Sequence, residues 1–400
     1  MHKLMFYSVL VLLSVSDLPA QWARSGFIVR SLTVSGTNLF AGTAGGGVFL
    51  STNNGTTWIA VGPGRALASS DVYSLPIIGT NLFAGTDGDG VFLSTNNGTS
   101  WTAVNSGLTN NRVFALIVKG TDLFAATNGG VFRSTNNGGS WTAVNSGLTN
   151  QLARSFAVND TILFVGTSGG GVFRSTNNGG TWVAVNSGLT FLDVIPLAVN
   201  GSNLFAGTYR DGVFLSTNNG TNWTAVNSGL TNLRLRSFAF SGTSLFAGTD
   251  GGVFLSANNG TNWTAVSLGL TDSVAFSLAV SGTNLFAGTD GGVWQRPLSE
   301  MITSVEMIAT DLPTHFSLSH NYPNPFNPTT TISFNLPLRS DVSLKVFDAL
   351  GRQVAILLSE ELPAGTYSTQ WDAGDAASGM YFYRLEAGEF LETKKLMLLR

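Results

Sequence analysis

The stretch Ser51–Trp58, STNNGTTW, decides the fold, because close copies of it return five more times along the chain. The tryptophans that close the copies lie 40 to 43 residues apart. They are Trp58, Trp101, Trp141, Trp182, Trp223 and Trp263. A fixed period of this length is typical of repeat architectures, in which each unit buries its apolar face against the next unit.

A second marker, LFAGT or a near variant, begins at Leu39, Leu82, Leu123, Leu163, Leu204, Leu245 and Leu285. One repeat, Phe238–Leu270, contains four short apolar or alternating segments separated by turns rich in Gly, Asn and Asp. The segments are Phe238–Phe240, Ser244–Thr249, Gly252–Ser256 and Thr261–Val266. Four strands in about 40 residues predict the blade of a β-propeller, and helical periodicity is absent.

The counts of the two markers differ, and the difference predicts how the ring closes. The seventh unit has three candidate strands, Phe276–Val280, Asn284–Thr289 and Gly292–Gln295, but no copy of the eight-residue motif. Gln21–Gly26 aligns with the text of a fourth strand, with Trp22 in place of the missing tryptophan. We therefore expect a seven-bladed propeller closed by its N-terminal strand, which removes exposed sheet edges.

The repeated motif resembles the Asp-box (BNR-like) turn, S-x-D-x-G-x-T-W, of sialidases, sortilin-like receptors and other propellers. All copies carry Asn where that motif has Asp, at Asn53, Asn96, Asn136, Asn177, Asn218 and Asn258. In such a turn Ser and Asn bond backbone amides, Gly takes positive φ, and Trp packs between sheets. We therefore read the motif, with its tryptophans, as architecture, since six equivalent copies cannot all be one catalytic site.

Composition excludes several classes of protein. The formal charge of −3 is too small to indicate a nucleic-acid partner, and the chain has no cysteine for a disulfide, thiol nucleophile or thiolate metal site. No cofactor or metal is expected. At the N-terminus, Lys3, the apolar run Leu4–Val15 and the small residue Ala20 have the layout of a secretory signal peptide over residues 1–20. No transmembrane segment is expected in the mature chain.

After a propeller predicted over residues 21–296, the composition changes. Residues 297–315 contain the first Glu residues of the chain and are predicted to be a linker. Residues 316–400 contain alternating strands with turns at Leu350-Gly351, Pro363–Gly365 and Ser378-Gly379. This pattern predicts a small Ig-like β-sandwich.

Four blocks of this segment resemble the type A C-terminal sorting domain of the Bacteroidetes type IX secretion system. The resemblance rests on Tyr322–Pro328, Asp348–Arg352, Gly379–Tyr383 and Lys394–Met397. The implied sorting residues are Pro323, Asn324, Pro325, Gly351, Arg352, Gly379, Tyr381, Lys394 and Lys395. The resemblance implies passage across the outer membrane by the type IX machinery, cleavage by its sorting peptidase, and an extracellular or outer-membrane surface location.

Catalytic side chains are scarce in the predicted propeller. Between Gln21 and Ser299 there is no His and no Glu, which excludes a His-based triad or His metal site and the Tyr–Glu pair of sialidases. Glycosidases need two carboxylates about 5–10 Å apart. Asp71 and Asp193 are the pair that keeps open the alternative of a secreted glycoside hydrolase or lyase.

The repeats differ most where the innermost strand begins, and there we expect a ligand site. Strand alternation directs this residue and the one two places earlier toward the channel mouth. The sequence YRDG at Tyr209–Gly212 replaces the usual hairpin on the same face. The predicted ligand-binding residues are Arg30, Asp71, Tyr73, Arg112, Arg154, Asp193, Tyr209, Arg210, Arg234 and Arg236.

The leading interpretation is a non-enzymatic binding or scaffold module, with a glycan or a surface protein as partner. Near-identical repeats also fit a weak binding surface that acts by avidity. A third possibility is a resemblance to photosystem II assembly factors, whose propellers carry similar repeats, but the secretion signals argue against that role.

Overall fold

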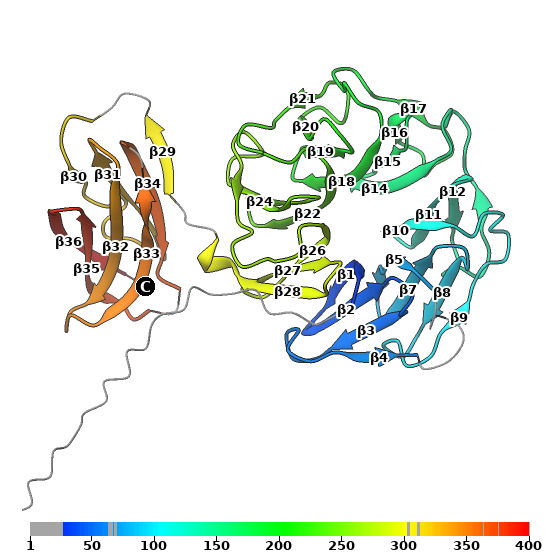
Figure 1. Cartoon of the computed structure of the whole chain (residues 1–400), viewed down its shortest axis with the longest axis horizontal. Coiled ribbons are helices and arrows are strands. Elements are labelled where there is room, and N and C mark those ends of the chain that lie inside the picture. The colour runs from blue at the N-terminus through cyan, green and yellow to red at the C-terminus, as the bar shows by residue number, and fades with distance from the viewer. Residues whose placement is uncertain are drawn as a thin grey trace, which may run out of the picture. The chain divides into compact units, whose positions relative to one another are not determined.

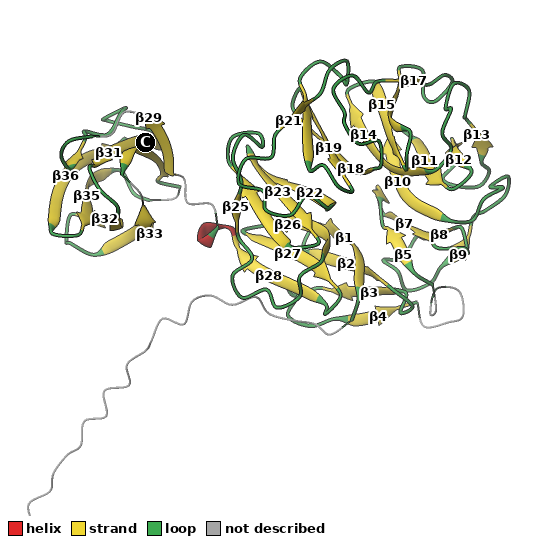
Figure 2. Ribbon diagram, turned by 45° about the horizontal axis from the view of Figure 1, so that its top comes forward, coloured by secondary structure: helices red, strands yellow, loops and turns green. Residues whose placement is uncertain are grey.

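The computed structural model describes residues 27–62, 67, 70–301, 305–309, 313–362, 364–374 and 376–399. The chain divides into two compact units, Met1–Leu298 and Ser299–Arg400. Both units consist of strands, and the described residues contain one short 3-10 helix, Leu298–Glu300, and no α-helix (Figure 2). The prediction of an all-β chain is therefore confirmed.

Successive antiparallel sheets form the first unit, and their first strands lie nearest the middle of a circular arrangement (Figure 1). The first two sheets contain β1 (Val29–Ser35), β2 (Asn38–Thr43), β3 (Val48–Ser51), β4 (Ile59–Val61), β5 (Val72–Ser74), β6 (Ile77–Ile78), β7 (Asn81–Thr86), β8 (Val91–Ser94) and β9 (Thr102–Ala103). The inner strand of the second sheet is split into β5 and β6, and Pro76, which lacks a backbone N–H, lies between them.

The middle sheets repeat one four-stranded pattern. Their strands are β10 (Val113–Lys119), β11 (Asp122–Thr127), β12 (Gly130–Ser134), β13 (Thr142–Ala143), β14 (Ala153–Asn159), β15 (Ile162–Thr167), β16 (Gly171–Ser175), β17 (Val183–Ala184), β18 (Val194–Asn200), β19 (Asn203–Thr208), β20 (Val213–Ser216) and β21 (Thr224–Ala225). The next sheet has β22 (Leu235–Ser241), β23 (Ser244–Thr249), β24 (Gly252–Ser256) and β25 (Thr264–Ala265). The predicted strands Ser244–Thr249 and Gly252–Ser256 match β23 and β24, whereas β25 is shorter than predicted because Thr261 belongs to the preceding turn, where its N–H donates to Asn258 O.

The last sheet has three strands, β26 (Ala275–Ser281), β27 (Asn284–Thr289) and β28 (Val293–Pro297). It packs against the first sheet through a cluster that contains Val29, Leu39, Ala41, Phe286 and Val293. Gln21–Gly26, the segment expected to supply a fourth strand, lies outside the described residues, as do Trp22 and the expected signal peptide. The blade count and the closure of the ring therefore stay predictions.

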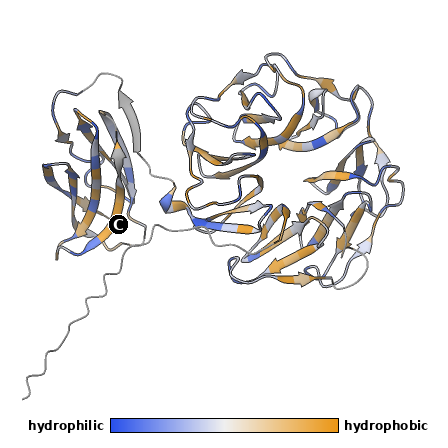
Figure 3. Ribbon diagram, in the orientation of Figure 1, coloured by the Kyte–Doolittle hydropathy of each residue, from blue (hydrophilic) through white to orange (hydrophobic). Residues whose placement is uncertain are grey.

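The LFAGT marker forms the second strand of each sheet and is almost wholly buried, in agreement with its apolar sequence (Figure 3). The Phe of each copy is at most 1% exposed, and the seven are Phe40, Phe83, Phe124, Phe164, Phe205, Phe246 and Phe286. The final Thr is buried too, and its hydroxyl donates to a carbonyl of the following hairpin, as in Thr167 Oγ1 to Gly171 O at 2.9 Å. Each repeat therefore satisfies its buried polar group locally.

The repeated STNNG turn is a self-contained hydrogen-bonded loop. In the Ser175–Trp182 copy, Ser175 Oγ and Thr181 N both donate to Asn177 Oδ1 at 2.9 Å, and Gly179 N donates to Ser175 Oγ at 2.9 Å. Asn178 takes a positive φ of 56°, which Asn tolerates better than most residues. The motif is therefore a turn between strands, as predicted.

The second unit contains two four-stranded sheets, ordered β29-β34-β31-β30 and β33-β32-β35-β36. Their strands are β29 (Val305–Ala309), β30 (Ser317–Leu318), β31 (Thr329–Leu336), β32 (Ser340–Asp348), β33 (Gln353–Leu362), β34 (Gly365–Asp372), β35 (Gly379–Ala387) and β36 (Phe390–Leu398). Residues from both sheets share one apolar core, which includes Phe334, Leu344 and Tyr383. Residues 297–315, expected to be a linker, contain β29, which pairs with β34. The Ig-like description stays a prediction.

Candidate ligand-binding site

A β-bulge at the same place in every inner strand of the first unit produces the candidate site. In β1 the pairing with β2 shifts between Val29 and Ser31, so Arg30 has no partner in the ladder. The same shift skips Tyr73, Phe114, Arg154, Arg236 and Phe276, and in β18 it spans Ile195 and Pro196. Because a bulge inserts one residue and redirects its side chain, these positions leave the regular pattern of the sheet together.

These bulged residues line one cavity of about 600 Å³. The lining includes Arg30, Tyr73, Arg112, Phe114, Arg154, Ser155, Ser168, Asp193, Tyr209, Arg236 and Phe276. The lining thus includes seven of the ten residues proposed from the sequence, whereas Asp71, Arg210 and Arg234 are not among the cavity's lining residues. A role of any of these ten residues in binding a ligand stays a prediction.

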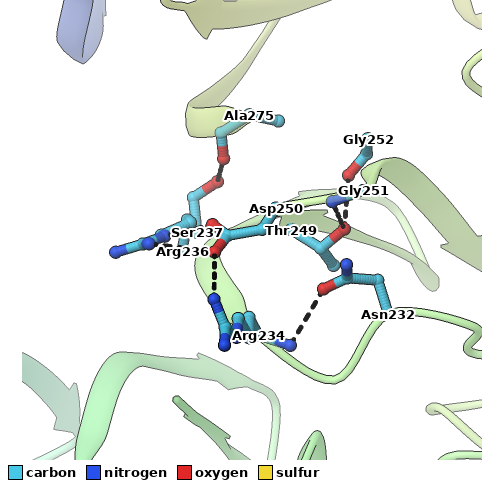
Figure 4. Close-up of polar contacts among 9 residues, drawn as sticks. All are labelled: Asn232, Arg234, Arg236, Ser237, Thr249, Asp250, Gly251, Gly252 and Ala275. Atoms are coloured by element: carbon cyan, nitrogen blue, oxygen red, sulfur yellow. Dashed lines mark hydrogen bonds and ion pairs between the residues drawn. The ribbon is translucent and has the colours of Figure 1, made fainter. Parts of the chain in front are cut away.

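Two of the cavity's arginines are neutralised by carboxylates from a neighbouring hairpin. Arg236 Nε lies 2.6 Å from Asp250 Oδ1 and its Nη2 lies 3.1 Å from Oδ2, with Arg234 Nη1 at 3.7 Å on the same carboxylate (Figure 4). Arg112 also makes two contacts with one carboxylate: its Nε lies 2.6 Å from Asp87 Oδ1, and its Nη2 lies 3.1 Å from Asp87 Oδ2. Burial lowers the pKa of Arg236, but the hydrogen bonds and charge of Asp250 raise that pKa overall.

The other two arginines of the cavity lie on aromatic rings. Arg30 Cζ is 4.4 Å from the centroid of Phe276, and Arg154 Cζ is 4.0 Å from that of Phe114. Across the described part of the chain, neither guanidinium has an ion-pair partner. Burial lowers the pKa of Arg154, with the charge of Asp193 acting in the opposite direction. Arg30 and Arg154 are therefore half-buried cations in cation–π contact with phenylalanine rings.

Tyrosines add hydroxyl groups to the same surface. Tyr73 Oη lies 3.4 Å from Asp87 Oδ2, and burial together with the charges of Asp87 and Asp71 raises the pKa of Tyr73. The ring of Tyr209 lies 5.3 Å from the Cζ atoms of both Arg234 and Arg236. Arg210 instead lies near Phe191, at 5.9 Å.

The two aspartates of the alternative enzymatic hypothesis are placed differently. Asp193 lines the cavity and accepts a hydrogen bond from Ser168 Oγ at 2.8 Å, whereas Asp71 is not among the lining residues. Asp193 is the only carboxylate among the cavity's described lining residues. The cavity therefore presents one carboxylate to a ligand, and a catalytic pair of Asp71 with Asp193 stays a prediction.

Asp87 and Asp250 are not among the site residues predicted from the sequence, yet both form ion pairs with arginines of the cavity. Both follow the LFAGT marker directly, and their backbone N–H groups donate to Asp71 O and Arg234 O, just before the inner strands β5 and β22. A repeated spacing in the sequence accompanies these contacts, because Asp250 lies 14 residues after its partner Arg236, and Asp87 lies 14 residues after its partner Tyr73. The aromatic platforms Phe114 and Phe276 were likewise missed as contacts of the arginines.

The tryptophans of the repeats lie between sheets, away from the cavity lining. The indole N–H groups of Trp141, Trp182, Trp223 and Trp263 donate to a valine carbonyl of the preceding sheet at 2.7–2.8 Å. Trp58 donates to Gly55 O in its own turn, and the buried N–H of Trp101 has no hydrogen-bond partner among the described residues.

In the second unit, the structure joins two of the predicted sorting blocks. Asn324 Oδ1 accepts from Met397 N at 3.0 Å, and Phe326 N donates to Met397 O at 3.0 Å, so the Pro323–Pro328 segment is bonded to β36, which carries Lys394 and Lys395. The Gly351-Arg352 turn is closed by Arg352 Nε on Asp348 Oδ2 at 2.7 Å. Tyr381, two residues after Gly379, donates to Ala377 O at 2.8 Å.

Neither a metal centre nor a membrane helix is found in the part of the chain that the structure describes. No three His, Cys, Asp or Glu side chains there lie close enough to hold an ion. No described helix is long and apolar enough to span a bilayer.

Known proteins are similar to the two units separately. By structure, the chain is similar to YCF48 bound to D1 peptide (13% identity, TM-score 0.58, 70% of this chain and 95% of that one). It is also similar to YCF48 from Cyanidioschyzon merolae (14% identity, TM-score 0.56, 70% of this chain and 98% of that one). The WD40 β-propeller domain of Doa1 is similar as well (12% identity, TM-score 0.53, 70% of this chain and 95% of that one). At such identities the likeness shows the fold alone, which is that of a β-propeller.

Family models match two stretches of the sequence. Residues 78–196 match the DUF6242 beta propeller domain, and residues 320–399 match the secretion system C-terminal sorting domain. No curated protein matches the chain. The chain therefore joins a β-propeller to a C-terminal sorting domain, which implies interaction with the type IX secretion machinery and export to the cell surface.

Proposed function

We propose that this protein is a secreted β-propeller that acts as a non-enzymatic binding or scaffold module outside the cell. One observation carries the proposal: seven bulged inner-strand segments contribute to one cavity of about 600 Å³, which is a usual size for a ligand pocket. Its lining combines cations, aromatic rings and hydroxyl groups, which suit recognition of a polar ligand. The partner is a glycan or a protein of a cell surface.

The proposed architecture is a seven-bladed propeller over residues 21–296, with Asp-box-type turns and Gln21–Gly26 as the last blade's fourth strand. The sheet β26-β27-β28 supports this, because within the described residues it has three strands where the other repeats have a fourth. Residues 316–400 form an Ig-like sandwich. The segment between these units contains β29, which pairs with β34 of the sandwich.

For export, residues 1–20 act as a signal peptide, and the sorting domain then directs the chain through the type IX machinery to its sorting peptidase. The match of residues 320–399 supports the second step. A chain that ends at residue 319 is expected to stay in the periplasm of a bacterium with this system, while the full chain reaches the surface or medium. Secretion of the truncated chain at the full-length rate would refute this route.

A secreted glycoside hydrolase or lyase is the alternative function, but no observation favours it over binding. Asp193 stands beside Arg154 in the cavity and Asp71 is not part of the lining.

An array of neutral glycans, acidic glycans and peptides tests the binding proposal. The full chain is compared with a variant that carries Arg30→Ala, Arg154→Ala and Arg236→Ala. Binding that the variant loses supports a site in the cavity. Binding that survives all three changes moves the site to the repeated outer surface, where avidity would operate. Absence of binding to every class refutes a binding module for glycans or peptides. A peptide ligand would parallel YCF48, whose structure is described as bound to D1 peptide.

A further inference from the structure

The four arginines of the cavity divide into two classes by their electrostatic state. Arg112 and Arg236 each form a two-point ion pair, with Asp87 and Asp250. Such a pair uses the guanidinium donors that face the carboxylate and cancels most of the charge. These two arginines therefore shape the cavity but have little charge left to attract a ligand.

Within the described residues, the charges of Arg30 and Arg154 are not compensated by an ion pair. Each has an aromatic ring on one face and, in the described residues, no carboxylate in ion-pair contact. Arg30 Nε is in addition buried without a hydrogen-bond partner. A buried donor that makes no hydrogen bond is costly, so Arg30 is ready to bind an anion that enters the cavity. Arg154 can bind an anion in the same way, because its charge is not compensated by an ion pair within the described residues.

Hydroxyl groups without partners lie beside the same two arginines. Ser31 and Ser237, one residue after the bulge, donate to carbonyls of the next sheet, Val72 O at 3.1 Å and Ala275 O at 3.3 Å. The equivalent Ser155 and Ser277 have buried Oγ atoms with no partner among the described residues. Ser155 follows Arg154 and lines the main cavity, and Ser277 lines an adjoining pocket with Arg30.

Asp193 limits the chemical class of ligand that the cavity can bind. Its carboxylate lies in the same lining as Arg154 and repels a simple anion such as sulfate. The same carboxylate accepts hydrogen bonds from hydroxyl groups, as it does from Ser168. A ligand that satisfies both signs of charge carries carboxylates and hydroxyl groups together.

We propose that the cavity binds an oligosaccharide of uronic acid units, whose carboxylates contact Arg30 and Arg154 and whose hydroxyl groups donate to Asp193. The inference rests on the proposed binding function and names its ligand class. An acidic peptide also brings carboxylates but lacks the array of hydroxyl donors that Asp193 and the orphaned serines would engage. The peptide is therefore an outcome of the test that contradicts the proposal.

Calorimetric titration of the full chain tests the ligand class. The probes are trimers of galacturonate, glucuronate, mannuronate and guluronate, the neutral trimers galactotriose and cellotriose, and a pentaglutamate peptide. We expect at least one uronate trimer to bind and the neutral trimers and the peptide to bind at least tenfold more weakly. Equal binding of a neutral trimer or of the peptide would overturn the uronate assignment and leave the binding function standing. Failure of every uronate trimer to bind would overturn the uronate assignment alone, because the array of glycans and peptides tests the binding function separately.

Variants test the residues. Arg154→Ala and Arg30→Ala are each expected to weaken binding of the uronate about tenfold to hundredfold, the loss for a charged hydrogen bond. Arg154→Lys, which keeps the charge without the planar fork, should lose less. Arg133→Ala is the matched control, because Arg133 pairs with Asp122 and is not part of the cavity lining. Unchanged binding in Arg154→Ala and Arg30→Ala, with thermal stability retained, would place the sugar elsewhere and overturn the proposal.

Discussion

The indole Nε1 of Trp182 donates a hydrogen bond of 2.8 Å to the carbonyl oxygen of Val144, so one side chain joins two neighbouring sheets. Its backbone N–H also donates to Ser146 O, at 2.8 Å. Trp182 is 3% exposed and packs with Phe124, Val165 and Phe173. The repeat therefore places a large apolar group and a satisfied polar atom at each of several inter-sheet contacts.

The first prediction concerns this contact. Trp182→Ala is expected to lower the free energy of unfolding by about 3–5 kcal/mol, because it leaves a cavity between two sheets. Trp182→Phe keeps most of the apolar volume and loses the hydrogen bond, and should cost less. Denaturant unfolding followed by fluorescence gives both values. Equal costs for the two variants would show that packing at this position matters little.

Gly147 gives the second prediction, because a Cβ there would overlap the backbone carbonyl of Trp182 and its φ is +79°. Gly147→Ala should cost more than Gly201→Ala, where φ is +57° and nothing lies within 4 Å of the added carbon. Backbone strain alone costs about 1–2 kcal/mol, and overpacking adds about 1–3 kcal/mol. Unfolding midpoints of the two variants make the comparison, and equal midpoints would contradict the close approach.

A third prediction addresses the Asn that replaces Asp in the repeated turn. Asn177→Ala removes the acceptor of two hydrogen bonds and should destabilise the protein by about 1–2 kcal/mol. Asn177→Asp keeps that acceptor and exchanges only the donor to Thr181 Oγ1, so its effect should stay within about 0.5 kcal/mol. Thermal unfolding of both variants checks the order. If Asn177→Asp were the worse variant, the side-chain amide would be the essential group.

The fourth prediction is a pH dependence in the second unit. Tyr383 is fully buried, donates to Ser319 O at 2.7 Å and accepts from Asn321 N at 3.0 Å. Burial raises the pKa of Tyr383 from 10.0 to about 12. Because the folded-state pKa is the higher one, its contribution to stability is complete below pH 10 and is lost as the pH rises through about 12.

Calorimetric scans across that alkaline range measure the effect. The wild-type transition should shift to lower temperature above pH 10, and Tyr383→Phe should remove part of that shift while starting from a lower stability. Tyr381→Phe is the matched control and should keep the shift. An identical alkaline shift in wild type and Tyr383→Phe would mean that another group titrates.

Much of the fold follows from the sequence because the same pattern of strands and turns occurs in every repeat. Period, turn residues and apolar segments agree in every copy, so β23 and β24 begin and end at the predicted residues. The fourth strands are harder to place, because their two paired residues have little burial and the preceding turn defines them. The strand β29 was missed because its neighbour in the sheet, β34, lies about sixty residues later in the sequence.

Within the candidate site, sequence variation between repeats located the inner-strand positions, and all seven of them line the cavity. The ion pairs were not predicted, because the spacing of 14 residues places Asp250 beside Arg236 only once the register of β22 on β23 is known. Which arginines remain unpaired, Arg30 and Arg154, is therefore a result of the structure. Asp71 and Arg234 were grouped with the cavity by the same strand alternation as Arg112 and Asp193, but only Arg112 and Asp193 are among its lining residues.

A crystal structure of the full chain with a bound ligand from the array tests the central claim most directly. We predict ligand density in the cavity, with an anionic group in contact with Arg154 and a hydroxyl group near Asp193. Density over the repeated STNNG turns, with the cavity empty, would contradict it and make the outer surface of the repeats the binding site.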